Sequence, residues 1–151
     1  FRNKINEKLF NIRNCYAINM HPSLLPRYAG CFSNFWNIFN NEKFTGITFH
    51  YMTKKFDSGN ILFQEKIKIN KIDTAFSLHY KLINLATEKL YNVLKNVFLK
   101  SPKGKKQKLK LRTYYSRKLP YKGKSLKNWD KKKKNLFDRG MYFPPFDFRK
   151  I

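Results

Sequence analysis

The sequence has few cysteines, few histidines and no long apolar run, and each scarcity excludes a class of protein. Its two cysteines, Cys15 and Cys31, lack CxxC spacing, which excludes a disulfide framework and predicts a reducing, cytoplasmic location. The three histidines, His21, His50 and His79, form no cluster with them, so no metal site is predicted. No apolar run reaches the length of a membrane span, and no signal peptide is visible, so no membrane association is expected.

Acidic residues are also scarce: 9 stand against 33 lysines and arginines, which gives a net charge of +24. One interpretation of this charge is nucleic-acid binding. The other is compositional, because lysine, asparagine, isoleucine and phenylalanine are all abundant and have AT-rich codons, so that lysine would simply cover a solvated surface. Both stay open, the first as weak, nonspecific binding through the Lys-rich segment, residues 100–112.

The pattern that is present is typical of an α/β domain. Residues 15–19 form a short apolar run, and residues 46–52 and 61–69 alternate between apolar and polar side chains, so three strands are predicted. Helices are predicted over 33–43 and over 75–99, where apolar residues recur at the i, i+3, i+4, i+7 spacing. The order strand, helix, strand, strand, helix fits the second half of a mostly parallel sheet with flanking helices.

Caps and composition set the boundaries of the predicted units. Ser33 is expected to cap the first helix, and Asp73 or Thr74 is expected to cap the second. The Lys-rich segment contains no acidic residue and has no apolar face, so residues 100–113 are predicted to be an exposed basic linker. It would join an α/β domain at 1–99 to a basic C-terminal extension at 114–151.

The stretch "NMHPSLLPRYAG" follows the first predicted strand directly. Alternation along the strand places Asn19 and His21 on the same side, where ligands bind in open α/β sheets. Pro22 and Pro26 would fix the departing loop, and Gly30 would allow a close backbone approach. An amide donor beside a histidine suits an electrophilic carbonyl that becomes an oxyanion.

Asp57, in the turn "KKFDSGN", is the candidate for handling protons. A carboxylate beside His21 would stabilise its charged form and receive a proton from an attacking amine, directly or through one water. Each residue also has an ordinary structural explanation: Asn19 as a turn residue, His21 as a satisfied core polar group and Asp57 as the former of an Asx turn.

Three separated blocks, "NMHPSLLPRYAG", "GITFHYM" and "DSGNILFQ", decide between these interpretations. In order and spacing they resemble the signature of the folate-dependent formyltransferases, which include enzymes that act on methionyl-tRNA and on sugar nucleotides. The family pattern is Asn-x-His-x-Ser-Leu-Leu-Pro, then Gly, then a later Asp-x-Gly. The positions that match it are Asn19, His21, Ser23, Leu24, Leu25, Pro26, Gly30, Asp57 and Gly59.

The resemblance implies a Rossmann-like formyltransferase fold that uses 10-formyltetrahydrofolate as formyl donor. By position, Asn19 would hydrogen-bond the formyl oxygen, His21 would stabilise the oxyanion, and Asp57 would orient His21 and relay the proton of the amine. The residues expected to bind the folate are Ser23, Leu24, Leu25, Pro26, Gly30 and Gly59. His50 and His79 match no catalytic position of the family and are expected to be structural.

The chain also departs from the family pattern. The first βα units of the family have no counterpart, so the chain is expected to be an N-terminally incomplete domain with weak activity of its own. Ala29 stands where most members have an arginine before the glycine. The favoured acceptor is an amino-sugar nucleotide, with methionyl-tRNA next. Alternatives are an inactive formyltransferase remnant or a basic RNA-binding module that stacks bases on Tyr114, Tyr115 and Tyr121.

Overall fold

The computed structural model describes residues 15–119, 128–144 and 146–147, together with residues 6, 8, 10 and 12. The main elements follow the predicted order of strand, helix, strand, strand, helix, so the α/β class is confirmed. In chain order the elements are β1 (Ile18–His21), β2 (Ala29–Gly30), α1 (Ser33–Phe39), β3 (Phe44–Tyr51), β4 (Ile61–Lys68), α2 (Ala75–Lys100), the 3-10 helix η2 (Leu109–Leu111), β5 (Tyr114–Tyr115), α3 (Lys131–Met141), β6 (Tyr142–Phe143) and β7 (Phe146–Asp147).

The central sheet has the strand order β1–β3–β4. Both neighbouring pairs are antiparallel, with Asn19 opposite His50 and Ile47 opposite Glu65. This corrects the predicted arrangement, because among the described strands only the short β2–β5 pair is parallel. For β3 and β4 the physical reason lies in the connection between them: residues 52–60 are too few for a parallel crossover, which needs about a dozen residues or more, but are enough for an antiparallel return.

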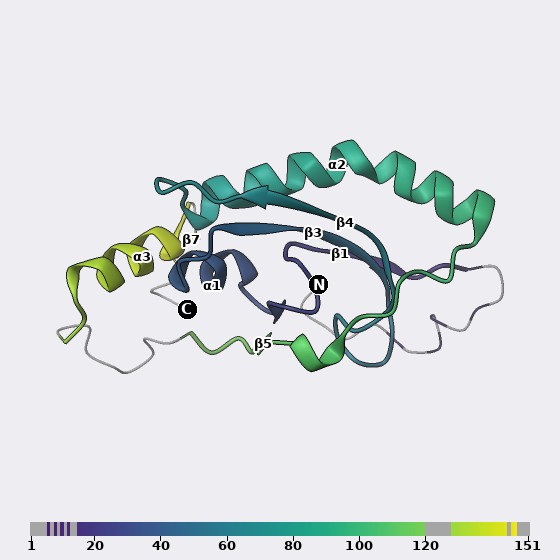
Figure 1. Cartoon of the computed structure of the whole chain (residues 1–151), viewed down its shortest axis with the longest axis horizontal. Helices are drawn as coiled ribbons and strands as arrows, with labels where there is room; N and C mark the ends of the chain where they lie inside the picture. Colours follow the sequence, from purple (N-terminus) through teal and green to yellow (C-terminus); the bar gives the residue numbers. More distant parts are fainter. Residues whose placement is uncertain are drawn as a thin grey trace.

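Helix α2 lies along one face of this sheet (Figure 1). It begins with a capping box in which the side chains of Thr74 and Ser77 each accept a hydrogen bond from the other residue's backbone N–H, so that Thr74 and not Asp73 is the cap. Its buried residues are Ala75, Leu78, Leu82, Ala86, Val93 and Val97, and all of them except Val97 belong to one core cluster with Ile47 and Phe49 of β3. Leu90 shares the spacing but is exposed.

Helix α1 differs from its prediction at its first turn. Ser33 is the first helical residue and not the cap, because Phe32 precedes it in the left-handed conformation at φ 55°. The Ser33 hydroxyl instead donates to the Pro22 carbonyl at 2.9 Å, which ties α1 to the loop after β1. α1 packs against α3 at one end of the molecule (Figure 1), where the ring centroids of Phe35 and Phe137 lie 6.1 Å apart.

Most side chains of the Lys-rich segment are exposed, but the segment also makes contacts that its composition did not indicate. It turns back from the end of α2 and runs beside the β3–β4 loop (Figure 1), where Ile61 and Lys105 exchange backbone hydrogen bonds of 2.8 and 2.7 Å. Its Gln107 side chain is buried, although the neighbouring lysines are exposed. The segment is thus tied to the start of β4 at Ile61, and the division of the chain at 1–99, 100–113 and 114–151 stays a prediction. Of the described helices, none is both long and apolar enough to cross a membrane.

Candidate functional site

The two faces of β1 have different surroundings: one packs in the apolar core and the other contains polar side chains. Ile18 and Met20 pack against the core cluster beneath α2. Asn19 and His21 point to the opposite face, as alternation along the strand predicted. The strand extends to His21 itself, so both side chains stand on a regular element and not in the loop that follows it.

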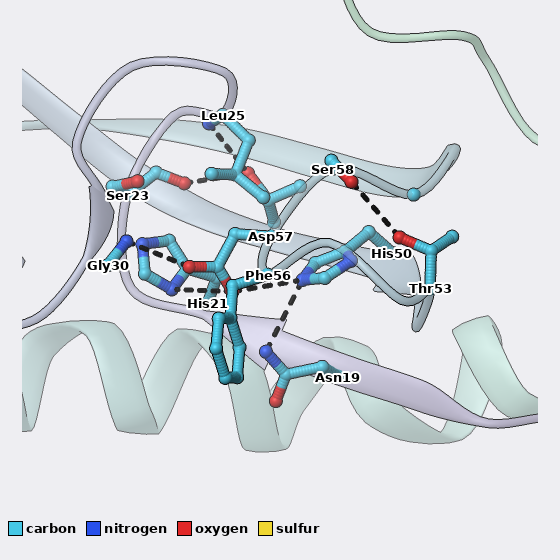
Figure 2. Close-up of polar contacts among 12 residues, drawn as sticks. Asn19, His21, Ser23, Leu25, Gly30, His50, Thr53, Phe56, Asp57 and Ser58 are labelled. Atoms are coloured by element: carbon cyan, nitrogen blue, oxygen red, sulfur yellow. Dashed lines mark hydrogen bonds and ion pairs between the residues drawn. The ribbon is translucent and has the colours of Figure 1, made fainter. Parts of the chain in front are cut away.

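His21 is held by two neighbours and is almost fully buried, at 5% exposure. Its Nε2 atom lies 2.8 Å from the carbonyl oxygen of Tyr28 and donates to it, which leaves Nδ1 facing Asp57. The distance from Nδ1 to the Asp57 Oδ1 atom is 3.7 Å (Figure 2). This is longer than a hydrogen bond but close enough for an ion pair if His21 is protonated. The predicted meeting of His21 and Asp57 is thus present.

Asp57 sits in an unusual backbone conformation, with φ at 50°. Its second carboxylate oxygen, Oδ2, accepts a hydrogen bond of 2.8 Å from the backbone N–H of Gly30. Gly30 itself has φ 93°, and a side chain there would run into the Tyr115 carbonyl, since a Cβ would lie 2.2 Å from that oxygen. The glycine is therefore required for β2 to approach β5 and to present its N–H to Asp57.

His50 is the residue that the sequence reasoning missed. From β3 its Nε2 atom lies 3.8 Å from the Asp57 Oδ1 atom and 3.3 Å from the Asn19 Nδ2 atom, so that His21 and His50 flank the same carboxylate (Figure 2). Its Nδ1–H donates to the Tyr51 carbonyl at 2.8 Å. Nε2 is then an acceptor, and it orients the Asn19 amide by accepting one of its two N–H bonds.

The charge state of His50 follows from its surroundings. Burial lowers the pKa of His50, outweighing the raising effects of the Tyr51 carbonyl and the Asp57 carboxylate, while nearby His21 lowers it further. A neutral His50 is what the hydrogen bond from Asn19 requires. The strand alternation could have found this residue, because it places His50 opposite the apolar face of its strand, but only the antiparallel register pairs it with Asn19.

The loop after β1 is built from the residues that were expected to bind the folate. The Ser23 hydroxyl donates to the Arg27 carbonyl at 2.8 Å, and the Leu25 backbone N–H donates to Thr48. The Leu25–Pro26 peptide is cis. These contacts shape the loop from within, and the expected folate contacts of Ser23, Leu24, Leu25, Pro26, Gly30 and Gly59 stay predictions.

Gly59, the last residue of the motif, lies against β3. A Cβ at this position would lie 1.9 Å from the Tyr51 carbonyl oxygen. The loop that carries Asp57 can close onto the strand only because this position has no side chain. Its structural role is therefore clear, separately from any contact with a ligand.

A cavity of about 260 Å³ opens beside His21. Its walls are mostly apolar and come from the loop after β1, from α1 and α2, and from the C-terminal residues; they include Pro22, Phe32, Phe35, Gly140 and Phe143. The buried Oδ1 atom of Asn34, also in its lining, has no hydrogen-bond partner in the described structure. Across the described residues, no three His, Cys, Asp or Glu side chains are grouped so that they could hold a metal ion.

Comparisons with known proteins agree on one family. Residues 4–94, more than half of the chain, match the family model described as Formyl transferase. The GDP-perosamine N-formyltransferase of Brucella melitensis biotype 1 is 38% identical over 148 residues, which cover 97% of this chain and 56% of that enzyme. This chain therefore spans little more than half of that relative.

Solved structures show the same fold. WlaRD, a sugar 3N-formyl transferase crystallised in the presence of dTDP and 5-N-formyl-THF, superposes with a TM-score of 0.72 at 28% identity, covering 83% of this chain and 47% of WlaRD. A 4-N formyltransferase from Francisella tularensis superposes with a TM-score of 0.73 at 25% identity, covering 96% of this chain and 60% of that one. The Rossmann-like formyltransferase fold is thereby confirmed, and the chain belongs to the formyl transferase family.

Proposed function

We propose that the protein transfers a formyl group from 10-formyltetrahydrofolate to the primary amine of an amino-sugar nucleotide. The observation that carries the proposal is the convergence of Asn19, His21 and Asp57, with His21 and Asp57 3.7 Å apart. The name of the Brucella relative supports the acceptor class, and the dTDP and 5-N-formyl-THF present with WlaRD support both the acceptor class and a folate donor.

In the proposed mechanism, Asn19 binds the formyl oxygen. One of its amide N–H bonds is used by His50, at 3.3 Å, and the second has no acceptor within the described part of the chain, so it can donate to a ligand. The geometry of the first bond sets the direction of the second. Asn19 is thus suited to polarise the carbonyl before the amine attacks and to stabilise the oxyanion afterwards.

His21 and Asp57 deal with charge and protons. Nε2 of His21 is engaged by the Tyr28 carbonyl, so in the imidazolium form Nδ1–H is the donor available to an oxyanion beside Asp57. When the amine nitrogen bonds to the formyl carbon, Asp57 accepts the proton that the nitrogen loses, directly or through one water. The bond from that carbon to the donor nitrogen then breaks, and a proton returned through Asp57 neutralises the leaving nitrogen.

One of the three tyrosines that the RNA-binding alternative requires for base stacking is already occupied. Tyr115 is stacked between Tyr28 and Trp36, with ring centroids 5.4 and 4.3 Å away, and is not free to stack on bases. Tyr114 is half exposed, and Tyr121 lies outside the described residues. The formyltransferase therefore remains the better supported function, and the cytoplasmic location stays a prediction based on the two free thiols.

The test is a formyl-transfer assay on the protein made from its complete reading frame. It is supplied with 10-formyltetrahydrofolate and, separately, with amino-sugar nucleotides and methionyl-tRNA, and N-formyl product is measured by mass spectrometry. Product from an amino-sugar nucleotide is the expected result. Product from methionyl-tRNA alone would show that the acceptor is methionyl-tRNA and not an amino-sugar nucleotide. No product from any of the amines would favour an inactive formyltransferase remnant. RNA affinity that falls steeply with salt would support a binding module.

A further inference from the structure

We propose that Gln107, in the Lys-rich segment, is a positioning residue that holds the backbone of Asp57 for formyl transfer. The inference rests on the proposed function, because it assigns Gln107 a role that acts through Asp57. It assigns a role in the site to a segment whose composition indicated a solvated linker or weak, nonspecific nucleic-acid binding.

The contacts of Gln107 are directed at the loop that carries Asp57. Its Nε2 atom donates one hydrogen bond to the Asp57 carbonyl, at 3.1 Å, and one to the Gly59 carbonyl, at 2.7 Å. Both N–H bonds of the amide are thereby used, and the side chain is only 6% exposed. Arg112 adds a hydrogen bond of 2.9 Å from its Nη2 atom to the Phe56 carbonyl. The Lys-rich segment thus supplies donors to three carbonyls of one short turn.

Asp57 needs such support because its backbone lies in the left-handed region, at φ 50°. That conformation is uncommon for residues other than glycine and persists where the surroundings specify it. Gly30 holds the side chain by donating to Oδ2, and Gln107 holds the main chain by donating to the carbonyl. Together they hold both ends of the residue and so fix the carboxylate relative to His21.

Gln107 is itself placed by a short strand-like contact. Ile61 and Lys105 exchange two backbone hydrogen bonds, and the Asn60 Nδ2 atom donates to the Lys103 carbonyl at 2.8 Å. Gly104, at φ 68°, turns the chain between these contacts. This register points Gln107 inward, while Lys106 and Lys108 on either side of it stay exposed.

A role in filling space does not explain the amide. The Oε1 atom of Gln107 is buried without a hydrogen-bond partner in the described part of the chain. Such an atom is costly to bury, so a methionine of similar shape would fill the same space at a lower cost. The N–H bonds are what the site uses.

The experiment compares Gln107→Met, Gln107→Glu and the exposed control Lys108→Gln in the protein made from its complete reading frame. We expect Gln107→Met to lower kcat about 10- to 100-fold, since small displacements of a catalytic group have effects of this size. KM for 10-formyltetrahydrofolate should hardly change, and Lys108→Gln should match the natural protein. An unchanged kcat in folded Gln107→Met would overturn the proposal.

Gln107→Glu supplies a readout that does not depend on the methionine variant folding. The introduced carboxyl keeps one donor while it is protonated, whereas the ionised carboxylate repels the Asp57 and Gly59 carbonyls. Relative to the natural protein at each pH, the kcat of this variant should therefore be highest at acidic pH and fall as the carboxyl ionises. A constant ratio across the pH range would contradict a positioning role for the amide.

The double variant Asp57→Asn with Gln107→Met separates this inference from the proposed function. If Gln107 acts through Asp57, the double variant has the kcat of Asp57→Asn alone, whereas independent roles give additive losses. Additive losses would overturn the inference. Should Asp57→Asn transfer formyl groups at the natural rate, the proposed mechanism fails first. Should Asp57→Asn be impaired and Gln107→Met not, only the inference fails.

Discussion

The two faces of β3 are equally buried and chemically opposite. Ile47 and Phe49 are 0% and 3% exposed and pack in the apolar core beneath α2, whereas Thr48 and His50 are 0% and 2% exposed and belong to a polar network on the other side. Burial alone therefore does not distinguish core from site. The two faces are distinguished by what their side chains contact. Ile47 and Phe49 contact apolar side chains, whereas Thr48 and His50 make directed hydrogen bonds.

This comparison implies two kinds of failure. Removing a side chain from the apolar face should lower the free energy of unfolding, because a cavity is left. Removing one from the polar side, or from the elements facing it, should leave hydrogen-bond partners unsatisfied, at a smaller cost in unfolding free energy, and should displace the polar groups that the proposed activity needs. The predictions below test that division, beginning with the largest effect.

The largest effect is expected for His21→Ala and Asp57→Ala in the protein made from its complete reading frame. Each should lower kcat about 10²- to 10⁴-fold, the range for losing an acid–base or oxyanion group. His79→Ala is the matched control, because His79 lies on α2 and its ring contacts in the described part of the chain are with Tyr80 and Phe143 and not with Asn19, His21 or Asp57. Steady-state formyl transfer measures all three variants. If both His21→Ala and Asp57→Ala have the kcat of the natural protein, neither residue takes part in the proposed mechanism.

Phe49→Ala probes the apolar face. We expect the free energy of unfolding to fall by about 3–5 kcal/mol, as for other buried phenylalanines. Phe44 lies in the same strand but is 45% exposed beneath Lys66, so Phe44→Ala should cost only about 0.5–1 kcal/mol. Urea unfolding gives both values. Equal losses would show that the face under α2 is not the stabilising one.

Thr48→Val keeps the shape of a buried side chain and removes its hydroxyl. That oxygen donates to the Ser23 carbonyl at 2.6 Å and accepts from the Leu25 N–H and the Gln64 amide. We expect a loss of about 1–3 kcal/mol in unfolding free energy, because these partners become unsatisfied.

The same strand contains a control for this change. The Thr45 hydroxyl is buried with no hydrogen-bond partner in the described structure, so Thr45→Val should be neutral or stabilising. Chemical denaturation of both variants measures the difference. A loss at Thr45 as large as that at Thr48 would contradict the assignment of the polar network to one face.

The smallest effect is a dependence of stability on pH at His50. Burial lowers the pKa of His50 below its unfolded value of about 6.5, so folding favours the neutral ring. The stability that His50 contributes is therefore present above about pH 6.5 and is lost as the pH falls toward the folded pKa. Urea unfolding between pH 8 and pH 5, roughly spanning that value, should show a shallower decline in His50→Gln than in the natural protein. Parallel declines would mean that His50 does not titrate with folding.

Local features of the fold were predictable from the sequence. The buried stripe of α2 and its cap at Thr74 depend on residues within one helix, where spacing determines which side chains share a face. The shared face of Asn19 and His21 follows in the same way from the period of a strand. The family signature then identified Asp57 as their partner.

Features that depend on pairing between distant segments were not predictable. His50 joins the site because β1 and β3 pair antiparallel with Asn19 opposite His50, and no local pattern specifies that register. Gln107 was hidden for a similar reason: its neighbours are lysines, and only the backbone bridge between Ile61 and Lys105 turns it inward. The charge of the neighbouring lysines predicted that Gln107 would be exposed to solvent, but the tertiary contact between Ile61 and Lys105 buries it.

The position of Gln107 also bears on the order of folding. Its hydrogen bonds to Asp57 and Gly59 span separations of 50 and 48 residues along the chain, and all of α2 lies between the two ends. Closing so long a segment carries an entropic cost that is recovered only after α2 has docked and brought the ends together. We therefore expect the turn around Asp57 to be ordered late, after the sheet and α2 have formed, and hydrogen exchange to show that turn opening before the core does.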